Sequence, residues 1–350
     1  MRGLGGFSLA RKLTRDRLRV LCYHGASTND EHLYEPFLFI QPEVFERRMR
    51  ILQRLGLPVV SLESATQMLN TGSVQNGEVA ITFDDGWKST LTHLAPTLKS
   101  FGFPASLFVT TYYCVRQQDV FNVVVWYMTT MTQRTQVHLE GVHPEIDGYY
   151  DLMQGRHDTA IRWIRFAETN FAPAERHGVL EKFAGALGMD LEAVLRDDRF
   201  KFMSAEEIAR IEKDYDIDVQ LHTHRHSLPA TSAQDCVDEV EENRKLLDEW
   251  TGKRCTQFCY PSGAYEPQHL EWLEGMGIQS AVTCDEGLNE PRGNPLLIKR
   301  YLDRNTWTDI EFEAAVSGVF DLAARTRGTW HLRAMDTAHL TLISSCAVGA

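Results

Sequence analysis

Two acidic side chains stand next to each other where a short apolar run ends. Residues 79–83 read Val-Ala-Ile-Thr-Phe, and Asp84, Asp85 and Gly86 follow directly. Neighbouring side chains of a strand point to opposite faces, but a strand end broken by glycine lets the backbone turn, so both carboxylates can face one pocket. One could then ligate a metal while the other accepts a proton from water. An ordinary Asp-Gly turn fits the same residues, and this motif alone does not decide between the two.

A histidine-rich segment offers partners for these carboxylates. Residues 221–227 read Leu-His-Thr-His-Arg-His-Ser. His222 and His226 share a side in a helix and also in a strand, whereas His224 joins them only if the segment is extended. A solvated histidine loop is the alternative, but beside an Asp-Asp strand end the metal site is favoured. Two imidazoles and Asp85 form an open site for zinc or a similar divalent ion. Such an ion brings the pKa of bound water from ~15.7 toward ~7, as amide or ester hydrolysis requires.

The elements that must position these motifs alternate between short apolar runs and longer amphipathic stretches. This alternation predicts an α/β fold with a parallel barrel or a doubly wound sheet, whose chemistry collects at the carboxyl ends of the strands. The acidic pair, the histidine segment and a Tyr-Pro-Ser-Gly turn at 260–263 each follow a predicted strand, so they should converge on one rim. The expected strands are 18–23, 79–83, 105–110, 217–221, 257–260 and 280–284. The expected helices are 41–55, 61–69, 91–101, 204–214, 232–250 and 267–276.

Composition excludes several classes of protein. The 350 residues are 43% hydrophobic and 24% charged, which is typical of a globular chain. The formal net charge of -12 argues against a nucleic-acid partner. The chain contains no run of ~18 apolar residues, so we expect no integral membrane segment. The N-terminus has no apolar core of the kind that secretory signals carry. The seven cysteines are scattered without a C-x-x-C pair, which favours a reducing compartment. We therefore expect a cytoplasmic protein, and the oligomeric state stays unknown.

The three motifs together resemble the polysaccharide deacetylase family, the NodB-homology carbohydrate esterases. The resemblance rests on Thr-Phe-Asp-Asp-Gly (82–86), His-Thr-x-x-His (222–226) and Phe-x-Tyr-Pro-x-Gly (258–263), in that order, and covers roughly residues 18–318. It implies a distorted (β/α) barrel. The sequence pattern itself weakens at about 112–200, which favours a helical insertion there, and again at 319–350, a tail of unclear structure. The resemblance also implies metal-dependent removal of N-acetyl groups from a polysaccharide, oligosaccharide or lipid-linked glycan.

The resemblance assigns roles residue by residue. Asp84 would be the general base, while Asp85, His222 and His226 would hold the divalent metal, with zinc as first choice and cobalt, nickel or manganese as alternatives. In the third motif, Tyr260, Pro261 and Ser262 would contribute to oxyanion and substrate binding, the backbone N–H of Ser262 donating to the oxyanion.

Two features of the family pattern are missing. No arginine stands shortly before Pro261, so Arg300 becomes the candidate substitute, against the alternatives of a surface charge or a structural salt bridge. The C-terminal Leu-x-His is also absent, because His331 and His339 lie in a weakly patterned tail. His24, at the end of the first predicted strand, is expected as the general acid, as in the branch with an N-terminal catalytic histidine. A strand-end histidine without a catalytic role is the alternative.

Other functions fit parts of the pattern. An O-acetyl esterase or a deformylase acting on a carbohydrate would use the same metal and base. A non-catalytic carbohydrate-binding relative is a third hypothesis, but it would not need Asp84, which is not a metal ligand. The sequence does not identify the sugar.

Overall fold

The core of the molecule is a sheet of seven parallel strands in the order β10-β9-β8-β5-β4-β1-β11. The computed structural model describes residues 5–326, so the tail histidines His331 and His339 lie outside the described residues. The strands of this sheet are β1 (Arg19–Tyr23), β4 (Val79–Phe83), β5 (Ala105–Val109), β8 (Ile217–Leu221), β9 (Gln257–Cys259), β10 (Ser280–Val282) and β11 (Tyr301–Leu302).

The strands are apolar because both faces of the curled sheet are covered. All five residues of β1, β4 and β5 are buried, since helices pack on the outer face and alternate side chains such as Val20, Ala80 and Phe108 form a core cluster of their own. Their ends are in register, since Tyr23 pairs with Phe83 and Val109 with Leu221. The residues that follow these strands therefore meet at one edge of the sheet.

The sheet curls toward closure. Ile298 lies just before β11, yet its backbone N–H donates to Ala281 of β10 at 3.0 Å and its carbonyl accepts from Thr283 at 2.8 Å. The two edge strands are thus linked through this segment. The prediction of a distorted (β/α) barrel is confirmed.

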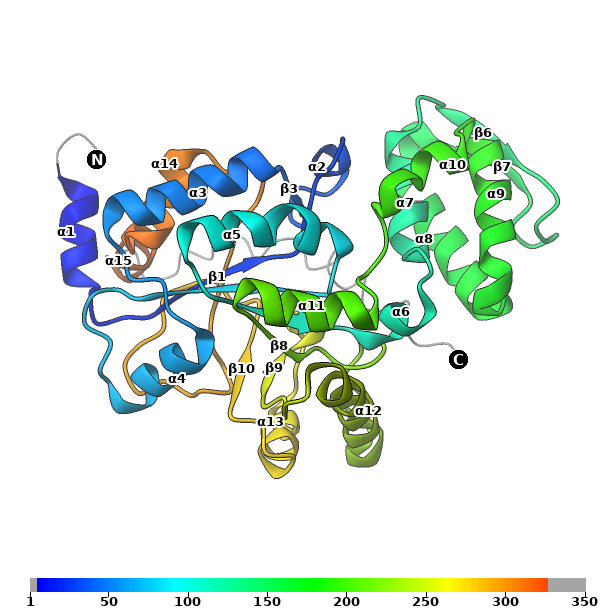
Figure 1. The fold of residues 1–350 in the computed structure, drawn as a ribbon. Coiled ribbons are helices and arrows are strands. Elements are labelled where there is room, and N and C mark those ends of the chain that lie inside the picture. Colours follow the sequence, from blue (N-terminus) through cyan, green and yellow to red (C-terminus); the bar gives the residue numbers. More distant parts are fainter. Residues whose placement is uncertain (1–4, 327–350) are drawn as a thin grey trace.

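Helices pack around the barrel, with α3 and α5 on one side of it and α12 and α13 on the opposite side (Figure 1). The segment expected as one helix at 91–101 begins with a π-helical turn, Thr90–Leu94, before α5. The helices outside the insertion are α1 (Gly6–Leu13), α2 (Glu31–Tyr34), α3 (Pro42–Leu55), α4 (Leu62–Thr71), α5 (Ala95–Phe101), α11 (Ala205–Tyr215), α12 (Ala233–Thr251), α13 (Pro267–Gly275), α14 (Asp309–Val316) and α15 (Val319–Thr326). Two short strands, β2 (Gly25–Ala26) and β3 (Phe39–Ile40), pair beside the barrel.

Packing extends past both expected boundaries of the barrel, residues 18 and 318. Arg11 of α1 donates to the Ser317 hydroxyl at 3.1 Å, and the backbone N–H of Leu288 donates to Asp321 of α15 at 2.8 Å. The first part of the expected tail is therefore a helix packed on the barrel.

A helical lobe lies between β5 and β8 and stands beside the barrel (Figure 1). Its interior is aromatic, with Trp163 stacked on Phe183 at 4.5 Å between ring centroids. Its elements are α6 (Thr111–Arg116), α7 (Phe121–Met131), β6 (Gln136–Leu139), β7 (Gly148–Asp151), α8 (Leu152–Asn170), α9 (Arg176–Leu187) and α10 (Leu191–Val194), with short 3-10 turns at Pro173–Glu175 and Arg196–Asp198. Among the described helices, none has the length and apolar character needed to cross a membrane.

Candidate active site

The acidic pair lies at the carboxyl end of β4, where the chain leaves the sheet. The backbone N–H of Asp84 still bonds to Tyr23 of β1 at 3.0 Å. Asp85 then takes a left-handed conformation with φ 73°, and Gly86 continues the turn with φ 101°. A Cβ on Gly86 would approach Val109 to 3.2 Å, so glycine suits this position. The turn buries both carboxylates in the same place, the arrangement that the sequence predicted for a strand end.

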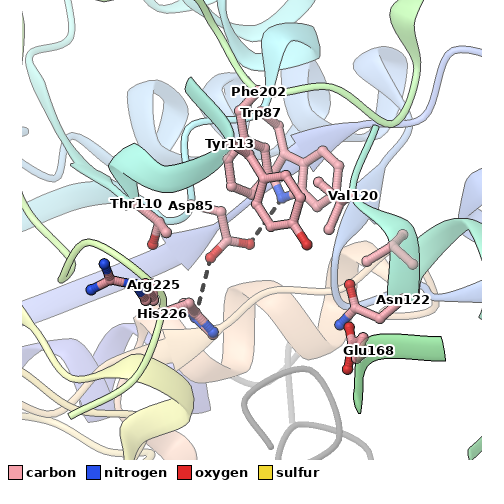
Figure 2. Close-up of a pocket in the computed structure, with 11 residues that line it drawn as sticks. Asp85, Trp87, Thr110, Tyr113, Val120, Asn122, Glu168, Phe202, Arg225 and His226 are labelled. Atoms are coloured by element: carbon pink, nitrogen blue, oxygen red, sulfur yellow. Dashed lines mark hydrogen bonds and ion pairs between the residues drawn. The ribbon is translucent and has the colours of Figure 1, made fainter. Parts of the chain in front are cut away.

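Asp85, His222 and His226 form a compact group with the donor atoms of a metal site. Asp85 Oδ1 lies 3.4 Å from His222 Nε2 and 3.5 Å from His226 Nε2, and the three ligand atoms are all within 4.8 Å of one another. Trp87 Nε1 donates to the second oxygen, Asp85 Oδ2, at 2.9 Å (Figure 2). The carboxylate is thereby oriented with one oxygen free to face the two imidazoles.

The backbone around His222 fixes which ring nitrogen faces this group. His222 Nδ1 lies 2.8 Å from the carbonyl of Cys259 and donates to it, which leaves the Nε2 lone pair pointing toward Asp85. Asn243 holds the His222 backbone N–H at 3.0 Å. An outward hydrogen bond of this kind is the usual support of a metal-binding histidine, so the residues present fit a divalent ion.

Electrostatics favour the protonation states that bind a metal. Burial alone would raise the pKa of Asp85, but the hydrogen bond with His222 and the nearby His24 and His226 imidazoles hold it well below its usual range. Burial, helped by His222, lowers the pKa of His226 to about 4. A carboxylate and a neutral imidazole are therefore present at neutral pH, as ligation requires.

His224 is turned away from this group. Thr223 and His226 adopt left-handed conformations with φ 63° and φ 56°, so the segment is neither helix nor strand. His224 instead contacts the Thr111 hydroxyl at 2.9 Å through Nδ1 and Glu242 at 3.3 Å through Nε2. It links the histidine segment to the first helix of the lobe.

Asp84 is held by a buried arginine. Arg300 Nη1 and Nη2 donate to its two carboxylate oxygens at 2.7 and 2.8 Å, and the arginine side chain is fully buried. Burial would raise the pKa of Asp84, but Arg300 outweighs it and lowers that pKa to about 2. Arg300 thus occupies the place of the missing arginine. A role of Arg300 in oxyanion or substrate binding, the other assignment considered for it, stays a prediction.

Two thiols complete the surroundings of Asp84. Cys22 Sγ lies 3.5 Å and Cys259 Sγ 3.4 Å from Asp84 Oδ2, where each can act as a weak donor. Both cysteines lie in strands of the barrel and are buried.

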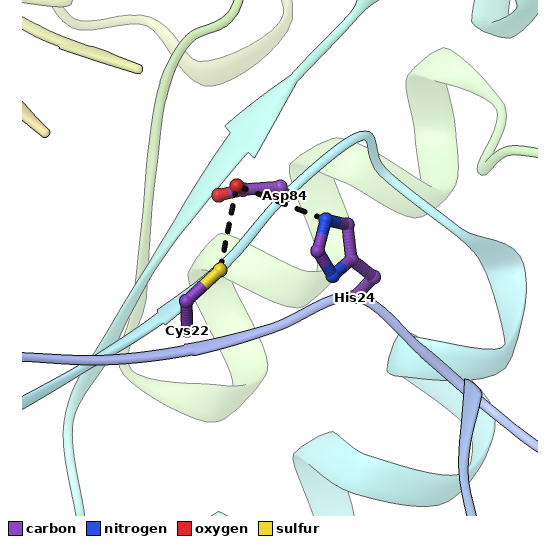
Figure 3. Close-up of side chains that lie close together, drawn as sticks. All are labelled: Cys22, His24 and Asp84. Atoms are coloured by element: carbon purple, nitrogen blue, oxygen red, sulfur yellow. Dashed lines mark hydrogen bonds and ion pairs between the residues drawn. The ribbon is translucent and has the colours of Figure 1, made fainter. Parts of the chain in front are cut away.

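His24, which follows β1, is a further neighbour of Asp84. Its Nε2 is 3.9 Å from Asp84 Oδ2 (Figure 3). The Thr90 hydroxyl donates to the His24 carbonyl at 2.7 Å and so fixes this strand end. Among the described residues, the buried His24 Nδ1 has no hydrogen-bond partner. The histidine predicted as general acid is therefore beside the predicted base, and its catalytic role stays a prediction.

The third motif forms a tight 3-10 turn, Pro261–Gly263, after β9. A Cβ on Gly263 would lie 2.6 Å from the Cys284 side chain, so only glycine lets the turn pack there. Ser262 is left-handed with φ 54°. The ring of Tyr260 is fully buried and its backbone N–H donates to Val282 at 3.2 Å. A role in oxyanion or substrate binding therefore stays a prediction for Tyr260, Pro261 and Ser262.

A pocket of about 40 Å³ lies beside Asp85 and His226. Aromatic rings of Trp87, Tyr113 and Phe202 line one side (Figure 2). The lobe supplies Tyr113 of α6 to this side. It also forms the other side, with Val120, Asn122 and Val123 from the start of α7 and Glu168 from α8. Sequence reasoning missed these lobe residues and also Trp87 as the support of Asp85.

The fold and this rim define a class of barrel hydrolase with paired carboxylates and histidines at its strand ends. The family model described as polysaccharide deacetylase matches residues 71–143 and 177–281, which is about half of the chain. The chain belongs to the polysaccharide deacetylase family, and the expectation of an enzyme of this hydrolase class is confirmed.

Solved structures support the same fold. The Streptococcus pyogenes deacetylase PplD, in complex with acetate, is 14% identical with a TM-score of 0.57, covering 86% of this chain and 98% of its own. IcaB from Ammonifex degensii is 18% identical with a TM-score of 0.53, covering 86% and 97%. A de-N-acetylase from Aggregatibacter actinomycetemcomitans is 14% identical with a TM-score of 0.54, covering 85% and 98%. A comparison with curated protein sequences gave no match.

Proposed function

We propose that this protein is a metal-dependent deacetylase that removes N-acetyl groups from an N-acetylated sugar. The observation that carries the proposal is that two adjacent carboxylates have different surroundings. Asp85 faces two imidazoles, whereas Asp84 is clamped by Arg300 and faces His24. These different surroundings support ligation by one carboxylate and proton transfer by the other.

Asp85, His222 and His226 would hold the divalent ion, with zinc the first choice for two imidazoles and a carboxylate. When bound, such an ion acidifies water and polarises the amide carbonyl. Trp87 and the Cys259 carbonyl keep the carboxylate and the His222 ring in the ligating orientation. The protein therefore supplies a fixed donor set before any substrate arrives.

Asp84 would accept the proton of the attacking water. Arg300 keeps it ionised and fixes the plane of its carboxylate, so it is ready as a base at neutral pH. The water oxygen bonds to the carbonyl carbon, the C–N bond breaks, and acetate leaves. His24 would give its proton to the departing amine. The backbone N–H of Ser262 is the proposed donor to the oxyanion.

A substrate panel tests this proposal. The purified protein would be assayed for acetate and formate release from chitooligosaccharides, acetylated xylan and a lipid-linked N-acetylated sugar. The expected result is acetate from an N-acetylated sugar, lost after chelation and restored by zinc. Release of formate alone, acetate from the O-acetylated xylan alone, or turnover that survives complete removal of metal would overturn it.

A further inference from the structure

A second and larger cleft lies next to the pocket that holds the metal ligands. Its volume is about 230 Å³. One wall comes from residues 112–121, which are α6 and the chain that follows it, and the other from the turn Pro173–Glu175 and the start of α9. Tyr113 lines both the cleft and the pocket (Figure 2), and the segment at 119–123 also contributes residues to both. The two spaces are therefore neighbours.

Asp119 brings an unpaired carboxylate to this cleft. Its Oδ1 atom is buried and has no hydrogen-bond partner among the described residues. Burial raises the pKa of Asp119, although Lys201 and His177 oppose the shift. These two groups have acidic partners of their own, since Lys201 donates to Asp198 at 2.8 Å and His177 lies 3.9 Å from Glu181. Buried polar atoms are nearly always hydrogen-bonded, so the carboxylate is suited to accept from a ligand.

Arg176 brings an unpaired cation to the opposite wall. Its Nε donates to the carbonyl of Phe171 at 3.2 Å and its Nη2 to the carbonyl of Glu168 at 3.1 Å. Both acceptors are neutral backbone groups, and no carboxylate among the described residues is paired with this guanidinium. The backbone thus holds Arg176 in place, while its charge and the hydrogens of Nη1 remain for a ligand.

The remaining chemistry of the cleft suits a neutral ligand with many hydroxyl groups. Tyr112 and Phe121 supply rings, and Gln118 supplies an amide that makes no hydrogen bond with the described residues. Rings combined with a few polar groups are the usual lining of a small-molecule site. An anion would meet Asp119 and a cation would meet Arg176, so neither is favoured. A hydroxyl group satisfies both, because it can donate to a carboxylate and accept from a guanidinium.

We propose that this cleft binds a second, uncharged sugar unit of the glycan, next to the unit that loses its acetyl group. The inference rests on the proposed deacetylase function. A glycan that crosses Tyr113 reaches from the pocket to the cleft. The wall at 112–121 lies within the family match, whereas Arg176 and the turn Pro173–Glu175 lie in residues 144–176, which the match skips. The second unit therefore depends on the lobe as well as on the part that the family shares.

Kinetics of two variants test the cleft. Asp119→Ala removes the carboxylate and Arg176→Met removes the guanidinium. The matched controls are Asp158→Ala and Arg165→Met, at exposed positions of α8. The substrates would be methyl N-acetylglucosaminide, which is a single unit, and chitotetraose.

The expected result is a loss confined to the longer substrate. D119A and R176M should each lower kcat/KM for chitotetraose by about tenfold, mainly through KM, because each loses a hydrogen bond to a charged group. The single unit does not reach the cleft, so its kcat/KM should change by less than about twofold, the scatter expected without a lost contact. Both controls should match the wild type on both substrates.

A melting temperature separates binding from support of the fold. D119A removes a carboxylate that is unpaired in a buried position, so its melting temperature should equal or exceed that of the wild type. D119A therefore decides the question even if R176M does not fold. Calorimetry with chitotetraose, on Asp84→Asn protein with and without D119A, gives the same comparison without turnover.

The failures of the two proposals can be told apart. D119A that matches the wild type on chitotetraose, or that loses equally on both substrates, would overturn the cleft and leave the deacetylase proposal standing. A wild type that uses the single unit as well as the tetramer would do the same. A wild type that releases no acetate from any N-acetylated sugar, with metal bound, overturns the deacetylase proposal itself.

Discussion

Two regions that are built in different ways meet at the pocket. The first is the rim at the strand ends, with Asp84, Asp85, His222 and His226, and the second is the lobe wall, with Val120, Asn122, Val123 and Glu168. At the rim, protein atoms orient the ionised groups, with Trp87 on Asp85 and Arg300 on Asp84. On the lobe wall, the Asn122 acceptor has no partner among the described residues. A rim fixed in advance suits bond breaking, because preorganised charge needs no rearrangement during the reaction. Unpaired groups on the lobe side, which include Asp119 of the neighbouring cleft, suit recognition.

The comparison also separates what the family shares from what this chain adds. The family match includes the strand ends that carry Asp84, Asp85, His222 and His226 but skips the whole of α8. We therefore expect changes at the rim to alter metal binding and chemistry, and changes in the lobe to alter selectivity or local stability.

The largest effect should follow loss of a rim ligand. His226→Ala leaves two of the three donor atoms, and we expect metal affinity to fall by more than about 100-fold, because even loss of a supporting residue costs 10–100-fold. Metal titration with competing chelators measures this. An affinity within a few fold of the wild type would show that His226 is not a ligand.

Removing the clamp on Asp84 should cost both stability and activity. Arg300→Met leaves a buried carboxylate without its cation, so we expect unfolding to become easier by roughly 3–5 kcal/mol at pH 7. Burial would then raise the Asp84 pKa of the variant above its usual value. The loss relative to wild type should therefore shrink as pH falls from that raised pKa toward about 2, where wild-type Asp84 is also protonated. Denaturant unfolding at a series of pH values measures this loss of stability, with Arg300→Lys as the control. Equal stability of R300M and wild type at pH 7 would contradict a stabilising ion pair between Arg300 and Asp84.

A change inside the lobe should leave the rim intact. Trp163 is fully buried against Phe183, and Trp163→Ala should destabilise the lobe by about 3–5 kcal/mol through the cavity that it leaves. Hydrogen exchange should accelerate in α7, α8 and α9, while zinc affinity changes less than about threefold, since no Trp163 atom lies at the metal site. Loss of metal binding in this variant would show that the two regions are one cooperative unit.

The smallest effect should come from His224, which connects the histidine segment to α6 of the lobe. Burial lowers the pKa of His224 to about 4, Glu242 opposing and Arg225 and Arg116 adding to the shift. The unfolded chain takes up this proton near pH 6.5, so the free energy of unfolding should fall as pH drops from about 6.5 to 4, by on the order of 1–3 kcal/mol. His224→Gln should reduce this fall in the metal-free protein. Because His226 is present in both proteins, its own contribution cancels, and parallel curves would contradict the assignment.

The sequence was sufficient for the barrel and for the metal group, for a physical reason. Parallel strands end at one edge, so motifs that follow 79–83 and 217–221 had to meet whatever the details of packing. His24 could be placed for the same reason, because it ends the first strand. The side chains that contact Asp84 were harder to predict from the sequence. Arg300 comes close to Asp84 only because the strands lie in the order β4-β1-β11 in the sheet.

The pocket wall could not be predicted from the sequence. Amphipathic spacing in α7 and α8 indicates which face is buried, but it does not say what lies opposite that face. Asn122 and Glu168 are 46 residues apart and line one pocket only because the two helices pack together. Trp87 was missed because a large aromatic residue after a strand is usually core, and its indole N–H has a target only once Asp85 turns.

The central claim is that Asp84 is a base standing beside a metal site rather than part of it, and one variant tests it directly. Asp84→Asn keeps the volume of the side chain and removes the charge. The account predicts that metal content, measured by elemental analysis, stays at the wild-type level while acetate release falls by about 10²–10⁴-fold, the contribution of a general base. Acetate release near the wild-type rate with metal bound would contradict the assignment.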